Sequence, residues 1–167
     1  MRLPETDVHI FPIHIQWAYS GEIVTASAEE EAEDAETVIR AGRLTELYLM
    51  GDSLGDTLLR NAVTDRLRTL WIAAVRGPSA EATRLVYNGG AEGCKLQRLC
   101  LDWYLCSRNA DTADWLGQHQ AKLPKAFLAD LAAVFMRANY DSDNVTDWEE
   151  ASSRTYHDHD TDVPPCD

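Results

Sequence analysis

The sequence lacks the features that mark membrane, secreted and zinc-binding proteins. No apolar run approaches the ~20 residues that a membrane-spanning helix needs. Residues 1–8 contain no apolar secretory segment, so we expect an intracellular protein, cytoplasmic or nuclear. The four cysteines form no Cys-x-x-Cys pair, which disfavours a zinc or redox site and favours buried, reduced thiols.

Basic residues are also scarce, at 15 Lys and Arg against 28 Asp and Glu, for a net charge of −13. Two segments hold the excess: residues 29–36 have six acids and no base, and residues 141–167 have nine acids and Arg154 alone. Together they carry −14, which leaves +1 for the rest of the chain. Acidic segments repel phosphate, so we expect no nucleic-acid partner. We expect no membrane partner either.

The chain contains enough apolar residues for one domain with a core, because 45% of its 167 residues are hydrophobic. Helical spacing is clearest over residues 44–74, which predict two amphipathic helices joined by almost no loop. Gly55 suits the end of the first helix, and Asp56 can cap the second. The apolar faces predicted for the two helices are Leu44, Leu47, Tyr48 and Leu54, and then Leu59, Val63, Leu67 and Trp71, beside Leu58, Ala62, Leu70 and Ala74.

A competing signal lies inside this stretch, where residues 51–54 read Gly-Asp-Ser-Leu. Those letters resemble the nucleophile block of the GDSL serine esterases, in which Ser53 would follow a strand and attack an ester. The esterase family also uses an Asp-x-x-His block and a Gly-x-Asn-Asp block, and neither occurs here. We favour the interpretation that Ser53 is an ordinary polar residue near a helix end. A small GDSL-type serine esterase that uses Ser53 is the alternative function.

Shorter helices are predicted on both sides of the hairpin. Residues 7–20 favour a helix that ends at Gly21, with a strand as the alternative because of their β-branched residues. Ser79 and Asp111 are predicted caps of two further helices, and residues 95–107 and 123–139 form two more, the last with Phe127 and Leu131 on its core side. The fold class predicted is mainly α, with little or no β.

The acidic tail at 141–167 has too few apolar residues to offset the entropy of folding, so we expect it to be disordered. It includes a His-Asp-His-Asp tract at residues 157–160, which resembles a metal-binding tract. An unfolded tract offers no fixed geometry, so we expect no metal site and no cofactor.

Two groups of residues carry a resemblance to a known family. The first is an aromatic-rich helix that ends in a Trp-x-Tyr-x-Gly pattern, formed by Trp17, Tyr19 and Gly21. The second is a Leu-Tyr start with a Leu-Arg-Asn-x-x-x-Asp core, formed by Leu47, Tyr48, Leu59, Arg60, Asn61 and Asp65. In this order they resemble the second half of a BTB/POZ domain of the filamentous-fungal type, and the resemblance extends over about residues 3 to 138.

The resemblance implies a partial BTB/POZ fold in three regions. Residues 1–76 would form the C-terminal half of the domain, with an acidic loop at 28–37. Residues 77–140 would form a helical extension, and residues 141–167 the disordered tail. The sheet-forming first half of a BTB domain is missing from this sequence, so we expect uncovered apolar surface on the helices, which favours association.

The function implied by the resemblance is a non-enzymatic protein-interaction module, of the adaptor type that links a substrate to a ubiquitin ligase. We expect a protein partner, with self-association as a further expectation. Apolar and aromatic side chains anchor such interfaces, and the candidate partner-binding residues are Trp17, Tyr19, Leu47 and Tyr48. The competing interpretation is that the three aromatic residues belong to the core.

Overall fold

Helices form every regular element in the described part of the chain. The structure, a computed structural model, describes residues 9–24, 34–74, 77–107, 109–140, 152 and 155–158. The elements are α1 (Ile10–Ser20), α2 (Asp34–Leu54), α3 (Thr57–Ala74), α4 (Ala80–Gly89), α5 (Lys95–Cys106), α6 (Ala110–His119), the short 3₁₀ helix η1 (Gln120–Lys122) and α7 (Lys125–Tyr140). The predicted mainly α fold is therefore confirmed. Within these ranges no helix combines the length and the apolar composition that crossing a bilayer requires.

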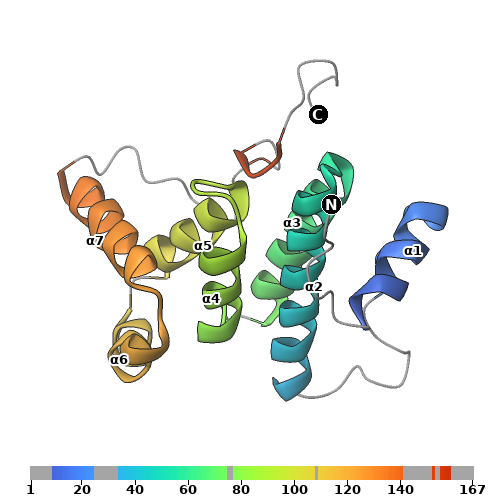
Figure 1. Cartoon of the computed structure of the whole chain (residues 1–167). Coiled ribbons are helices and arrows are strands. Elements are labelled where there is room, and N and C mark those ends of the chain that lie inside the picture. Colours follow the sequence, from blue (N-terminus) through green and yellow to red (C-terminus); the bar gives the residue numbers. More distant parts are fainter. Residues whose placement is uncertain are drawn as a thin grey trace.

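The predicted hairpin is formed by α2 and α3, which pack side by side (Figure 1). Gly55 ends α2 with a left-handed φ of 70°, a conformation that glycine adopts without steric cost. Asp56 then caps α3, because its carboxylate accepts a hydrogen bond from the Leu59 N–H at 2.9 Å. A Cβ at Gly51 would stand only 3.2 Å from Arg60 Cγ, so the glycine that weakens α2 lets α3 pack closely against it.

The main core lies between this hairpin and helices α1, α4 and α5. Its buried members include Ile10 of α1; Leu44, Leu47, Tyr48 and Met50 of α2; Leu59, Val63, Leu67 and Trp71 of α3; Val86 of α4; and Leu96, Leu99 and Cys100 of α5. The row predicted for the second helix of the hairpin is therefore confirmed. Because α4 and α5 share this core with the hairpin, the boundary predicted after residue 76 does not separate two cores.

A second, smaller core forms where α5 meets α7, with α6 alongside (Figure 1). Phe127 and Leu131 are buried in it, as predicted. Tyr104 of α5 contacts Phe127 edge to face, with ring centroids 5.3 Å apart. Its hydroxyl donates a hydrogen bond to the Pro78 carbonyl at 3.0 Å, which ties α5 to the residues that precede α4.

Some local predictions were wrong. Leu54 and Leu58 are exposed instead of packed, because they flank the turn that joins α2 to α3. The cap of α6 is Asn109, whose side-chain oxygen accepts from the Thr112 N–H at 2.8 Å, and Asp111 lies inside the helix. α2 begins at Asp34, so the last residues of the predicted acidic loop are helical, while its residues 28–33 lie outside the described part.

Candidate functional site

The outer face of α1 is an exposed apolar surface at one edge of the molecule (Figure 1). α1 contains no Asp, Glu, Lys or Arg residue. On the inner side, Ile10 is buried and Trp17 is half-buried against the main core. On the outer side, Phe11, Ile15 and Tyr19 follow one another at intervals of four residues, which places them in one row, and all three are exposed. We call these three residues the α1 outer face.

The four predicted partner-binding residues do not lie together on the surface. Leu47 and Tyr48 are at most 1% exposed, and Trp17 packs against the same core. Leu47 and Tyr48 are thus corrected from partner contacts to core residues, because the inward face of α2 is covered by the helices around it. Tyr19 is 90% exposed and stays a candidate anchor. The other two members of the α1 outer face were not among the predicted residues, although their spacing and the lack of formally charged residues in the helix were visible in the sequence.

Ser53 does not occupy the position that an esterase nucleophile needs. It lies in the last turn of α2, and residues 47–50 before it are helical and do not form a strand. Its hydroxyl donates a hydrogen bond to the Leu49 carbonyl at 3.0 Å, which is the ordinary bond of a serine inside a helix. The side chain is exposed to solvent, so the site provides neither the enclosure nor the strand-to-helix turn of a serine nucleophile.

No group of three or more His, Cys, Asp or Glu side chains in the described ranges is placed to hold a metal ion. Burial raises the pKa of the Cys100 thiol well above its ordinary value of 9.0, so this thiol stays protonated and unreactive. In the tract at 157–160, His157 contacts Asp65, with 2.8 Å between Nε2 and Oδ1. Residues 159 and 160 lie outside the described part.

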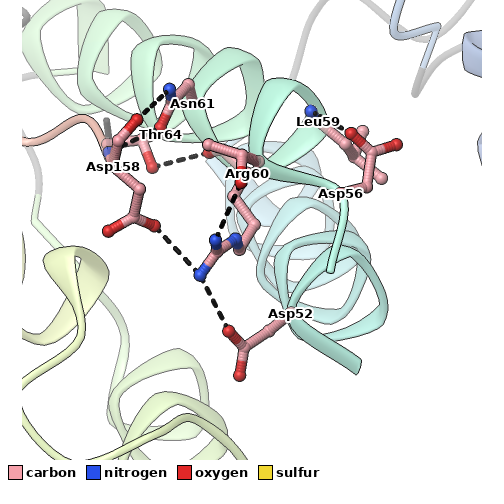
Figure 2. A network of polar contacts seen from close by, with 8 residues as sticks. Asp52, Asp56, Leu59, Arg60, Asn61, Thr64 and Asp158 are labelled. Atoms are coloured by element: carbon pink, nitrogen blue, oxygen red, sulfur yellow. Dashed lines mark hydrogen bonds and ion pairs between the residues drawn. The ribbon is translucent and has the colours of Figure 1, made fainter. Parts of the chain in front are cut away.

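A polar network lies at the N-terminal end of α3, centred on Arg60 (Figure 2). The Arg60 guanidinium bridges two carboxylates, those of Asp52 and Asp158, each at 3.0 Å. The side chain of Asn61 makes two hydrogen bonds to the backbone of Asp158: its oxygen accepts from the N–H at 2.8 Å, and its amide donates to the carbonyl at 2.9 Å. Arg60 and Asn61 belong to the pattern that resembles the BTB core, and here both bind Asp158, which lies 97 positions from Asn61.

Asp158 belongs to the segment Thr155–Asp158, which we call the docked segment and which lies over α3 and α5 (Figure 1). Tyr156 is 1% exposed, and its hydroxyl donates to Asp102 Oδ2 at 3.1 Å. Arg68 of α3 lies over the Tyr156 ring, 6.0 Å from its centroid, in cation–π geometry. Lys95 Nζ donates to the Thr155 carbonyl at 3.3 Å.

The prediction of a disordered tail is therefore wrong for the docked segment. Its single aromatic side chain enters the main core, and the polar groups on either side of that ring find partners on α3 and α5. The composition of the tail did not predict this order, because one buried tyrosine and several charged contacts can hold a segment that is otherwise hydrophilic. The remainder of residues 141–167, apart from Ser152, lies outside the described part.

A wide, open cleft of about 1850 Å³ lies beside α4, α5 and α6. Three tryptophans contribute to its walls: Trp71, Trp103 and Trp115. His119 stacks on Trp115, with ring centroids 4.5 Å apart, and its Nδ1 is hydrogen-bonded to the Trp115 carbonyl at 2.9 Å. Because a carbonyl oxygen can only accept, this bond assigns the ring proton to Nδ1 and fixes the orientation of the imidazole in the cleft.

No family model, characterised protein or solved structure matches the chain. Two features of the described residues are left to interpret: the exposed α1 outer face, and the contacts by which α3 and α5 hold the docked segment.

Proposed function

We propose that this chain is a non-enzymatic protein-interaction module, and that a partner protein covers the α1 outer face. The observation that carries the proposal is the row of Phe11, Ile15 and Tyr19 at the surface of a helix with no formally charged residue. Surface helices ordinarily keep polar and charged residues on the outward side. A helix that is apolar on both sides is expected to be covered on both, and the core covers one side of α1.

The chemistry of these side chains suits a protein interface. Aromatic residues bury a large apolar area at a small cost in side-chain entropy, and Tyr adds a hydroxyl for a polar contact at the rim. The lack of formally charged residues in α1 removes the desolvation cost that a charged helix would incur on binding. It also lets a partner approach a strongly acidic molecule without charge repulsion at the point of contact.

The adaptor role is the narrower part of the proposal, and it is supported by the sequence resemblance to BTB/POZ proteins. On that basis the partner is a substrate or a cullin-type scaffold of a ubiquitin ligase. The exposed apolar row of α1 gives such a partner a surface to cover.

The test compares wild type with Phe11→Glu/Tyr19→Glu. The control is Leu58→Glu/Met136→Glu, which places the same two charges on side chains that are 66% and 63% exposed elsewhere. Light scattering over a range of concentrations tests self-association, and photo-crosslinking from position 15 in cell extract, followed by mass spectrometry, tests other partners. We expect the association or the crosslinked partner to be lost in the α1 variant and kept in the control.

A wild-type chain that stays monomeric, with the same crosslinked proteins in all three chains, would contradict the proposal. Circular dichroism must show equal helical content in the three proteins, so that a lost contact cannot be ascribed to unfolding. Co-purification of a cullin-type scaffold with wild type, and not with the α1 variant, would support the adaptor role specifically.

A further inference from the structure

Every residue of the docked segment is contacted by a side chain of α3 or α5. The Thr155 carbonyl accepts from Lys95, and the Tyr156 hydroxyl donates to Asp102. His157 contacts Asp65 through its imidazole. Asp158 is held at its backbone by Asn61 and at its carboxylate by Arg60.

These contacts have the character of peptide recognition. An amide side chain that pairs with both the N–H and the carbonyl of one residue binds groups that every residue except proline carries, and it fixes the direction of the bound chain. Selectivity then comes from two side-chain contacts, one at Tyr156 and one at Asp158. The first contact buries the aromatic ring under Arg68 with Asp102 at the hydroxyl end, and the second places the Arg60 guanidinium against an acid two residues further on.

We propose that this face of α3 and α5 is a recognition site for a partner peptide with an aromatic residue followed two positions later by an acid. The docked segment occupies the site in cis, and the partner peptide takes its place. This site is separate from the α1 outer face, so either proposal can fail without the other.

The tether explains why the cis segment occupies the site and why a partner can displace it. Tyr140 ends α7 and Thr155 begins the docked segment, so residues 141–154 connect the two. A connection of this length gives an effective concentration of about millimolar, which a short four-residue contact needs in order to stay bound. A partner that presents the same chemistry with additional contacts competes by mass action.

The probe is a fluorescent peptide of residues 155–160, Thr-Tyr-His-Asp-His-Asp, titrated by anisotropy against the full-length chain. Tyr156→Ala/Asp158→Ala vacates the site, so this variant should bind the peptide about tenfold more tightly than wild type if the wild-type site is open about a tenth of the time. A peptide with alanine at both positions should bind neither chain. Adding Asn61→Ala should remove the binding, while the matched control Asn88→Ala, an exposed asparagine of α4, should not.

A second measurement uses wild type alone and does not depend on the variants folding. Trypsin cuts after Lys and Arg, and Arg154 is the only such residue within 141–167. A cut there lies directly before the docked segment and releases the fragment 155–167. The probe peptide contains no trypsin site. Excess peptide should speed release of this fragment, because it displaces the segment and exposes the bond.

Three results would overturn the proposal. The first is a double variant with wild-type helical content that does not bind the peptide, and the second is equal binding by the variant and wild type. The third is a wild-type dimer that becomes a monomer in the double variant and that added peptide leaves intact, which would assign the site to tail exchange between two copies.

Discussion

Buried tyrosines make the fold sensitive to alkaline pH. Tyr48, Tyr104 and Tyr156 are each 1% exposed, and burial is the main cause that raises the pKa of each phenol well above its ordinary value of 10.0. Burial likewise raises the pKa of the Cys100 thiol well above 9.0. All four groups stay neutral in the folded protein at a pH where the unfolded chain loses their protons.

The sign of the effect follows from this difference in pKa. A pKa that is raised on folding contributes stability that is fully present below the unfolded pKa and is lost as the pH rises toward the folded pKa. The loss therefore begins near the unfolded pKa, at about pH 9 for the thiol and about pH 10 for the phenols. At about pH 11 each phenol lowers the free energy of unfolding by about 1.4 kcal/mol and the thiol lowers it by about 2.7 kcal/mol. The three phenols and the thiol together lower it by about 7 kcal/mol. Domains of this kind have about 5–15 kcal/mol of stability, so we expect the chain to unfold near this pH.

The assay follows tyrosinate absorbance and far-ultraviolet circular dichroism in one pH titration. We expect the buried tyrosines to ionise in one cooperative step that coincides with the loss of helix. In Tyr104→Phe, the lost hydrogen bond to Pro78 lowers the free energy of unfolding by about 1 kcal/mol at neutral pH. Relative to wild type the variant should gain about 1.4 kcal/mol as the pH rises to about 11, because it has no phenol to ionise, so the deficit disappears and the variant becomes slightly the more stable. Gradual ionisation of all tyrosines with helical content unchanged through pH 11 would refute the reasoning.

Two further predictions concern single residues. Gly77→Ala should lower the free energy of unfolding in urea by about 1–3 kcal/mol, because its Cβ would lie 2.3 Å from the Trp103 ring. Gly117→Ala, in α6 with no atom within 4 Å of the added Cβ, should instead raise it by up to about 1 kcal/mol, and a loss at both sites would contradict the packing argument. Ser53→Ala should leave hydrolysis of a short-chain aryl ester at the wild-type rate, and a drop on substitution would restore the esterase hypothesis.

The local structure of the hairpin could be predicted well from the sequence. The row Leu59, Val63, Leu67 and Trp71 repeats at the helical period. The turn is equally local, since Gly55 needs only its own backbone conformation and Asp56 caps the N–H of a residue three positions later. The same kind of signal failed for Leu58, because periodicity shows which residues share a face and not how far along the helix the core extends.

The candidate sites depended more on tertiary structure. Apolar residues on both sides of residues 10–20 were apparent in the sequence, but which side faces the core depends on the packing of α1 against α2. Leu47 and Tyr48 were predicted partner contacts and became core residues for the same reason. A side chain's own neighbours in the sequence do not say what will cover it.

The sequence alone thus determined where most of the helices lie, the Gly55–Asp56 turn and the inward face of α3, because the interactions that set them join residues at most a few positions apart. Tertiary structure alone decided that Asp65 binds residue 157 and that Asn61 binds residue 158. Those pairs are 92 and 97 positions apart, and no local pattern in the chain records them. A tail with the composition of a disordered segment acquires a fixed structure at these residues because the folded α3 and α5 bring a ring pocket and its polar partners together.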